Sequence, residues 1–538
     1  MVAPLHPMIV QTLSAQDETR FIHSEISAVD CLISQLHEKR AALMQRLNGV
    51  QAATRNLPPE VLARIFQYAN PPLDLNENSV IGHRPTIRAW AYFVYTIAQV
   101  CVYWRNVAWS TPQLWATLDA TLFSDVPHDR FAEVLHTHLT NSTYLPFSLK
   151  LELETLPSGH FAEVLFHSEL TKRIHRLRLL LNTRPRGYGY PVNSIKYLAD
   201  FQAESSSGDK PKNILSLSEI SYLRKLYISW CDIIPKLPSA SLTELELSRC
   251  PIDVCVGILM QCTQLVKFRS NVTYEAREGS SSLNGGPADH PLILHHLEEF
   301  TWSHRDAPCA RRLLRRLRLP NIERLTWYDE SSGDDSQEAF QALASNIPKN
   351  MGVLTLGKLV HWDYGEMNGV FESLSGVHSL NLEGCDNSMV LTLMYRLGRV
   401  DNSTPSYLPS LSHLKIDGYS KPPESWTQTR YDVEICQQFP SIAGNRLRGG
   451  FCEEFYVEFH NAKVRWPSGV RNNLCELIAE GYDLMVAEDN AEVDWLDSEV
   501  DNTSEDDENS DEDEDEEEEE EEDNFGDDYE VTWSDLEF

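Results

Sequence analysis

The stretch NLPPEVLARIFQYA, residues 56–69, places two prolines directly before a short and strongly apolar segment. Proline suits the first turn of a helix, where its missing N–H costs no hydrogen bond, and Asn56 can cap that turn. Apolar side chains then recur at helical spacing, at Val61, Leu62, Ile65, Phe66 and Ala69. A helix of about ten residues is too short to be stable alone. We therefore expect another surface, in this chain or in a partner, to cover it.

A second helical pattern follows in TIAQVCVYWRNVAW, residues 96–109. One face of this helix carries Ile97, Val100, Cys101, Trp104 and Ala108. The pattern ends before Pro112, after which Leu114 and Trp115 form an apolar pair. Residues 71–92, between the two patterns, are rich in turn-forming residues, and we interpret them as an insertion or loop.

Together these segments follow the pattern L-P-x-E-[VI]-L-x-x-I-F, then V-C-x-x-W-R, then T-P-x-L-W. The pattern resembles the F-box in the form common in large mushroom-type (basidiomycete) fungal families, and the resemblance covers residues 54–120. The insertion at 71–92 departs from a compact F-box. The resemblance implies that Leu57, Pro58, Glu60, Val61, Leu62 and Ile65 contact a Skp-type adaptor. It implies an F-box core made of Phe66, Val100, Cys101, Trp104 and Trp115.

An F-box joins its chain, through the adaptor, to the cullin of an SCF-type ubiquitin ligase. The resemblance therefore implies a substrate-recognition subunit. The eleven cysteines are an odd number and contain no CxxC pair, which indicates a reducing intracellular compartment, so we expect the protein in the cytoplasm, the nucleus or both. Two alternatives stay open. One is a scaffold that binds the adaptor outside a ligase, and the other is a repeat protein that binds histones or other basic proteins through its acidic end.

Residues 16–50 carry apolar side chains in steps that alternate between four and three, which is a heptad seam. The seam contains Ile22, Ile26, Val29, Ile33, Leu36, Leu43, Leu47 and Val50, with Arg40 as its one charged position. We expect a coiled-coil-like helix, similar to the helix that often precedes the F-box in the fungal families. It either packs on its own protein or forms a coiled coil, within the chain or as a weak self-association through residues 22–50.

Between residues 121 and 475, short strand signals of the form LxxLxL recur at irregular intervals. They lie at residues 223–228, 242–247, 297–302, 322–327, 377–382 and 411–416, with weaker forms at 174–179 and 265–268. Three carry a following cysteine, at Cys231, Cys250 and Cys385. This resembles the leucine-rich repeat, which implies an α/β fold: an irregular solenoid of parallel strands and helices that binds a substrate protein of unknown identity.

Most of the negative charge lies at the C-terminal end. Residues 488–538 contain 29 acidic residues, whereas residues 1–487 carry 46 basic and 52 acidic groups. Such an acidic end cannot bury enough apolar surface to fold, so we expect a disordered tail. The near-neutral body and acidic tail argue against nucleic acid as the main ligand.

Two remaining patterns bear on partners and chemistry. The basic run ARRLLRRLRLP, residues 310–320, is either a solvated helix face with its leucines turned inward or a docking surface for an acidic partner. The stretch GVLTLGK at 352–358 has phosphate-loop spacing, but Leu359 stands where a magnesium-binding Ser or Thr is required. No catalytic or metal-binding motif stands out, and no apolar run is long enough to span a membrane. We expect no catalysis, no cofactor, no metal and no membrane partner.

Overall fold

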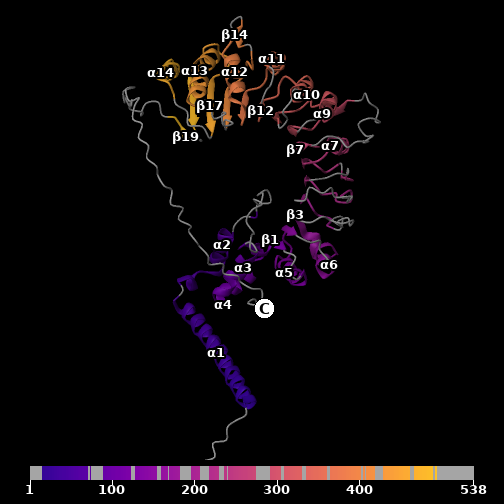
Figure 1. Cartoon of the computed structure of the whole chain (residues 1–538), viewed down its shortest axis with the longest axis vertical. Helices are drawn as coiled ribbons and strands as arrows, with labels where there is room; N and C mark the ends of the chain where they lie inside the picture. The colour runs from indigo at the N-terminus through magenta and orange to yellow at the C-terminus, as the bar shows by residue number, and fades with distance from the viewer. Residues whose placement is uncertain are drawn as a thin grey trace, which may run out of the picture. The chain divides into compact units, whose positions relative to one another are not determined.

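The described part of the chain covers most of the predicted helical and strand segments (Figure 1). The computed structural model describes residues 15–51, 53–70, 73, 89–122, 128–153, 159–167, 169–181, 195–205, 217–229, 235–238, 240–273, 291–304, 308–329, 335–359, 364–401, 404–405, 407–417, 428–460, 466–488 and 491–493. The predicted acidic tail from residue 494 onward lies outside these residues, as do Cys231 and Val50's side chain.

Helices dominate the first part of the chain, and strands alternate with helices after it. The helices are α1 (Ala15–Gln51), η1 (Ala53–Asn56), α2 (Pro59–Ala69), α3 (Ala89–Val100), α4 (Val102–Trp109), η2 (Pro112–Trp115), α5 (His128–Asn141), α6 (Gly159–His167), η3 (Glu169–Arg173), α7 (Ile252–Leu259), α9 (Pro308–Arg316), α10 (Asp335–Ala344), α11 (Tyr364–Ser373), α12 (Asn387–Leu397), α13 (Gln428–Leu447) and α14 (Ser468–Ala479).

The main-sheet strands are β1 (Thr117–Leu122), β2 (Phe147–Leu153), β3 (Ile174–Leu181), β4 (Asp200–Ser205), β5 (Lys225–Ser229), β6 (Glu244–Ser248), β7 (Lys267–Thr273), β9 (Glu299–His304), β11 (Arg324–Asp329), β12 (Val353–Gly357), β13 (Ser379–Glu383), β16 (His413–Asp417), β17 (Glu454–His460), β18 (Asp483–Glu488) and β19 (Ala491–Glu492). Two small ribbons pair β8 (Leu292–Ile293) with β10 (Leu317–Arg318), and β14 (Val400–Asp401) with β15 (Thr404–Pro405).

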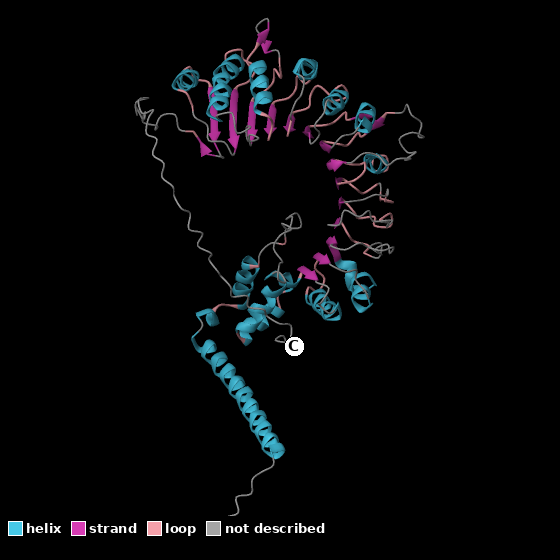
Figure 2. Cartoon of the chain, in the orientation of Figure 1, coloured by secondary structure: helices cyan, strands magenta, loops and turns pink. Residues whose placement is uncertain are grey.

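The main sheet joins 15 strands in chain order, so each of its strands pairs with the next main-sheet strand along the sequence. All neighbours from β1 to β18 are parallel, and only β19 pairs antiparallel, on β18. Each predicted strand signal lies in this sheet. Helices α5–α7 and α9–α14 lie on one side of it (Figure 2). The chain therefore has the predicted α/β architecture, with an N-terminal helix, a helical segment and a mostly parallel sheet.

Alternating side chains explain why these short segments form strands. Leu226 and Ile228 in β5 are buried, as are Leu245 and Leu247 in β6, while the residues between them lie on the other face. Burial of each leucine contributes about 1.5–3 kcal/mol, which a single short strand could not gain without its neighbours.

Two of the repeat cysteines are buried where the chain leaves the sheet. The thiol of Cys250 donates to the carbonyl oxygen of Ser248 at 3.4 Å, and the thiol of Cys385 donates to that of Leu356, in the preceding strand, at 3.3 Å. Cys250 and Cys385 are thus small buried side chains just after strands β6 and β13.

The basic run at 310–320 also has a structural explanation. Residues 308–316 form α9, in which Leu313 and Leu314 are buried, and Leu317 just after it is buried too. Arg311 forms an ion pair with Glu338 of α10. The leucines thus face inward and the arginine side joins a neighbouring helix, as expected for a partly solvated helix face.

The C-terminal edge of the sheet differs from the prediction. Helix α14 ends at Ala479 and β18 begins at Asp483. Gly481 adopts a φ of +92°, a conformation that favours glycine and ends the helix. The sheet therefore extends past residue 475, where we had ended the repeat-like body. Strand β19 lies within residues 488–538, which we had assigned to the disordered tail.

His138 of α5 connects the sheet to the helical segment before it. Its ring is buried, with its centroid 5.0 Å from that of Trp115 and 5.9 Å from that of Tyr95. Burial lowers the pKa of His138 from 6.5 to about 4, because the charged imidazolium would lose its hydration.

We predict that this buried imidazole makes the protein sensitive to acid. Between pH 6.5 and pH 4 the unfolded chain binds a proton at His138 that the folded chain does not, so stability is complete above pH 6.5 and falls as the pH decreases. The loss reaches about 3 kcal/mol by pH 4. Urea unfolding at pH 7 and pH 5 should show a smaller loss for His138→Phe than for the wild type. The control His136→Phe, on the exposed side of α5, should retain the wild-type loss. Equal acid sensitivity in all three proteins would contradict this assignment.

Candidate functional site

Helix α2 carries apolar side chains in two stripes that lie about 100° apart around its axis. Leu62 and Phe66, four residues apart, are 1% and 2% exposed and form its inner face. Val61 and Ile65, each one position earlier, are 43% and 45% exposed and form its outer face. Only one of the two apolar stripes is therefore covered within the described chain.

The inner face packs against the motif residues of α4. The rings of Phe66 and Trp104 meet edge to face, with centroids 4.9 Å apart. The indole N–H of Trp104 donates to the hydroxyl oxygen of Thr54 at 3.0 Å, across 50 residues of sequence. The side chain of Trp104 therefore connects α4 to both η1 and α2.

Tyr103 fixes the segment that leads into α2. Its hydroxyl donates to the carbonyl oxygen of Leu57 at 2.5 Å, and Leu57 itself is half-buried. The next residues, Pro58 and Pro59, are exposed, as is Glu60 in the first helical turn. The carboxylate of Glu60 stands near the positive end of the helix dipole, which favours the helix at that end. The Leu57–Pro58 turn is consequently held in place while its prolines face the solvent.

Trp115 closes the other side of this small module. It is fully buried, and its indole N–H donates to the carbonyl oxygen of Ala108 at 2.9 Å. The ring centroids of Trp109 and Trp115 are 5.0 Å apart, and the ring of Tyr95 meets that of Trp115 edge to face. The T-P-x-L-W motif therefore packs the end of α4 onto the start of the sheet.

Two sequence assignments need correction. We placed Leu62 at the adaptor surface, but it is buried beside Phe66, because it lies on the inner face of α2. We placed Val100 in the core, but it is 40% exposed at the end of α3. Cys101 and Trp104 are half-buried, and Cys101 caps α4 by accepting the backbone N–H of Trp104.

Tyr68 belongs to the outer face, and sequence reasoning missed it. It lies three residues after Ile65 and seven after Val61, so it continues the same helical stripe, and it is 83% exposed. Its spacing was the available signal. The sequence analysis counted Ala69 as the last apolar residue of the stripe and left out Tyr68, one position before it.

The predicted insertion is shorter than expected. Helix α3 begins at Ala89, inside the range 71–92 that we had interpreted as a loop. Apart from Leu73 and the start of α3, residues 71–92 lie outside the described residues. The relation between the two halves, which the sequence left open, is settled by the contacts of α4 with Thr54, Leu57 and Phe66.

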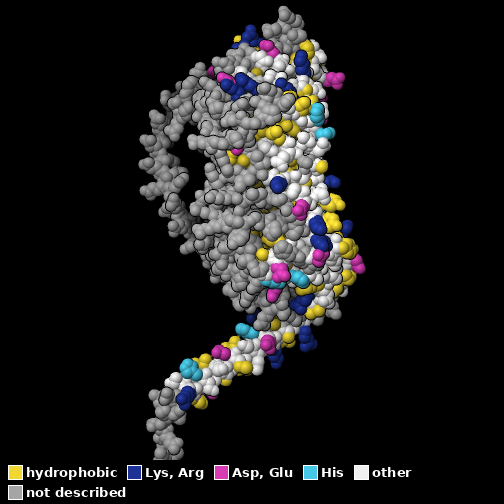
Figure 3. Space-filling model, turned by 90° about the vertical axis from the view of Figure 1, so that its right-hand side faces the viewer, with side chains coloured by type: hydrophobic (Ala, Val, Ile, Leu, Met, Phe, Trp, Pro, Cys, Tyr) yellow, Lys and Arg dark blue, Asp and Glu magenta, His cyan; other side chains and the backbone are white. Residues whose placement is uncertain are grey.

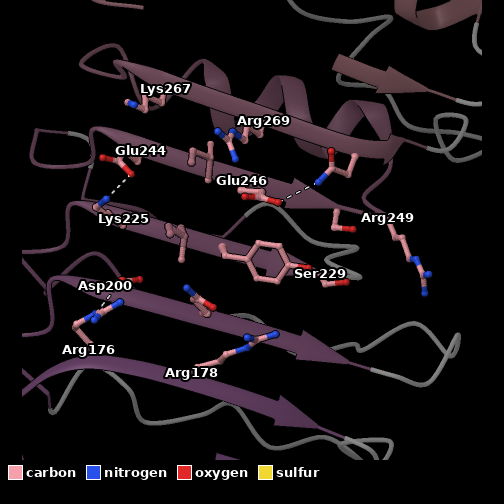
Figure 4. A pocket seen from close by; sticks show the side chains of 16 residues that line it. Arg176, Arg178, Asp200, Lys225, Ser229, Glu244, Glu246, Arg249, Lys267 and Arg269 are labelled. Carbon is pink, nitrogen blue, oxygen red and sulfur yellow. Dashed lines mark hydrogen bonds and ion pairs between the residues drawn. The ribbon is translucent and has the colours of Figure 1, made fainter. Parts of the chain in front are cut away.

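The sheet face opposite the helices offers a second candidate surface. Strands β3–β7 line a groove of about 580 Å³ there, with polar and charged side chains projecting from it (Figure 4). From β3 to β11, one row of residues in register on neighbouring strands of the main sheet alternates in charge. This row contains Arg176, Asp200, Lys225, Glu244, Lys267, Glu299 and Arg324.

Neighbouring charges in the row pair with one another. Arg176 lies 3.4 Å from Asp200, Lys225 lies 2.7 Å from Glu244, and Glu299 lies between Lys267 at 3.0 Å and Arg324 at 3.4 Å. Opposite charges on neighbouring strands stabilise the sheet and its register. The row is thus largely neutralised within the protein.

A second row lies two residues further along the same strands and includes Tyr227, Glu246 and Arg269. Burial raises the pKa of Glu246, and the nearby Arg269 and a 3.0 Å hydrogen bond from Asn271 oppose that shift. Ser229, which also lines the groove, and Ser303 of β9 are buried. A groove with both signs of charge fits a polypeptide surface better than the evenly negative backbone of a nucleic acid.

The stretch with phosphate-loop spacing belongs to the main sheet. Val353–Gly357, inside the phosphate-loop match, is strand β12, so its N–H groups are engaged in the sheet ladder. Within the described part of the chain, no group of three or more His, Cys, Asp and Glu side chains is arranged to hold a metal ion. Among those same residues, no helix combines the length and apolarity that crossing a bilayer requires.

We predict that Tyr103→Phe loosens the Leu57–Pro58 turn. The variant loses the hydrogen bond to the Leu57 carbonyl, at a cost of about 0.5–1.5 kcal/mol. Amide hydrogen exchange across residues 54–58 should therefore accelerate by about three- to tenfold. The control is Tyr68→Phe, which removes a hydroxyl from the solvent-exposed outer face. It should leave amide exchange in the Leu57–Pro58 turn unchanged. Unchanged exchange in Tyr103→Phe would show that another contact holds this turn.

Comparison with known proteins gives one match, and it falls on this helical module. No curated protein matches the chain. Residues 54–121 match the family model described as F-box-like, with α2, α3, α4 and η2 inside the matched range. This segment of the chain is an F-box-like domain.

Proposed function

We propose that this chain is the substrate-recognition subunit of an SCF-type cullin–RING ubiquitin ligase. F-box domains typically bind Skp-type adaptors, and the F-box-like domain fits that role. The observation that carries the proposal is the outer face of α2, which remains apolar and exposed although the inner face of the same helix is packed. An apolar stripe of this kind is typical of a surface that a partner covers.

The adaptor contacts the outer face of α2 and the turn before it. We assign Pro58, Val61, Ile65 and Tyr68 to this contact, with Glu60 at its polar rim. Leu57 and Leu62 support the surface from inside. Apolar burial supplies the affinity, because each such side chain contributes about 1.5–3 kcal/mol when fully covered, whereas an exposed ion pair contributes about 0–1 kcal/mol.

The sheet then serves as the substrate-binding body. We propose that it is an irregular leucine-rich-repeat-like solenoid, supported by strands that pair in chain order and by the buried cysteines at its corners. The target protein binds the groove over β3–β7, where side chains of both charges face the solvent. Ubiquitin transfer is carried out by other subunits, and this chain contributes proximity. It acts without a cofactor of its own, in the cytoplasm, the nucleus or both.

Reconstitution separates a ligase subunit from a scaffold that merely holds the adaptor. The full chain, a Skp-type adaptor and a cullin are mixed, and the complex is resolved by size-exclusion chromatography. A ligase subunit co-elutes with both partners. Failure to bind the adaptor rules out the proposed function, whereas binding to the adaptor without the cullin supports the scaffold.

Two neighbouring residues of α2 give a matched pair of variants. Ile65→Ala removes an outer-face side chain, so it should raise the dissociation constant for the adaptor about tenfold and leave the free energy of unfolding nearly unchanged. Phe66→Ala opens a cavity beside Trp104 and should lower the free energy of unfolding by about 3–5 kcal/mol. Isothermal titration and urea unfolding of the full chain measure the two effects. Tight adaptor binding by Ile65→Ala would contradict the assignment of the outer face.

A further inference from the structure

Helix α1 presents an apolar seam that the described chain leaves uncovered. Every described side chain of α1 is exposed, and hydrophobic side chains are visible along it (Figure 3). Ile26, Ile33 and Leu36, at the middle of the seam, are 51%, 45% and 56% exposed. Among the described residues, no segment covers the seam of α1.

The seam has the residue types of a two-stranded coiled coil. Counting the seam positions in heptads places Ile26 and Ile33 at position a, and Val29, Leu36 and Leu43 at position d. β-Branched residues at a with leucine at d favour two strands. The question is then which helix supplies the second strand, and in which direction it runs.

The charges of α1 are separated along its length. Residues 15–33 contain four acidic residues and one arginine, whereas residues 34–51 contain three basic residues and one glutamate. A second copy running in the opposite direction places the acidic half of each helix against the basic half of the other. The helix is complementary to itself in this orientation alone.

The residues that flank the seam support the same orientation. Glu18, Glu25, Lys39 and Arg46 all occupy position g, and all are exposed. In an antiparallel pair, a twofold axis brings the g positions of the two copies together, so that Glu25 faces Lys39 or Arg46 of its partner, depending on the register. In a parallel pair, g meets the following e position, and Glu25 faces the like charge of Asp30.

Arg40 distinguishes the two orientations again. It is the charged residue at an a position, and a parallel pair places two copies of it in one layer of the seam, where they repel. In an antiparallel pair, a positions meet d positions. Arg40 then packs its methylene groups against an aliphatic residue, Ile22 or Val29, and extends its guanidinium to the solvent.

We propose that two copies of this chain pair through α1 as an antiparallel coiled coil. The pairing joins two chains through residues outside the F-box-like domain, so a dimer displays two adaptor surfaces and two sheets. It is independent of the ligase assignment, since the contact uses none of the outer-face residues of α2.

The seam is tested first, by sedimentation equilibrium of the full chain over a range of concentrations. The wild type should form dimers, and Ile33→Asp, which puts a charge into the seam, should be monomeric at the same concentrations. Ser24→Asp carries the same change on the opposite face of α1 and should dimerise like the wild type. A wild type that stays monomeric up to its solubility limit overturns the proposal, even if another protein binds α1.

The direction of pairing is tested by the sign of a charge reversal. Glu25→Lys should weaken the antiparallel dimer by about tenfold in dissociation constant, because two attractions become repulsions. Adding Glu18→Lys, Lys39→Glu and Arg46→Glu reverses all four g charges and should restore the wild-type value in either register. In a parallel dimer, Glu25→Lys would meet Asp30 and bind more tightly. Tighter binding by Glu25→Lys, or no restoration in the variant with all four charges reversed, overturns the antiparallel arrangement.

Discussion

The contact between Phe66 and Trp104 is the constraint on which the F-box-like domain depends. An eleven-residue helix gains too little from its own hydrogen bonds to persist in water. Packing of its inner face against α4 supplies the missing stability. The same packing fixes the rotation of α2 about its axis, so that Val61, Ile65 and Tyr68 point outward together. Exposure of the outer stripe is thus a consequence of how firmly the inner stripe is held.

The two faces of the sheet also differ in role, as the two stripes of α2 do. One side of each strand is leucine-rich and packs under the helices, and the other carries the paired charges of the row from Arg176 to Arg324. The apolar side provides the free energy of assembly and also fixes the register, because a one-residue slip would turn its leucines to the opposite face. The charges on the far side pair across neighbouring strands. The groove of β3–β7 therefore has a defined pattern of charge before any target arrives. A preorganised polar surface of this kind contributes to specificity more than to affinity.

The sequence predicted those elements whose own residues show a regular apolar spacing. The strands with an LxxLxL spacing were found because leucine at alternate positions marks a buried face. Strand β2 was missed because its leucines lie at every second position without the LxxL step, and β4 because Phe201 is its one large apolar residue. The F-box-like domain was recognised from its motif, yet Leu62 and Val100 were assigned to the wrong side. Val61 and Leu62 are adjacent apolar residues, and the sequence around them does not show which one is buried. The answer depends on which face of α2 packs against Trp104, which lies more than 40 positions away in the sequence. For α1, the seam was visible in the sequence, whereas its full exposure was not.

The central claim is that a partner covers the outer face of α2, and protection of Tyr68 tests it most directly. Hydroxyl-radical footprinting of the full chain, with and without a Skp-type adaptor, reports the solvent exposure of individual tyrosines. Tyr68 and Tyr144 are similarly exposed in the free chain, at 83% and 86%, and Tyr144 lies after α5, outside the F-box-like domain. The account predicts that the adaptor protects Tyr68 and leaves Tyr144 as reactive as before. Equal modification of Tyr68 in the free and adaptor-saturated chain would contradict it.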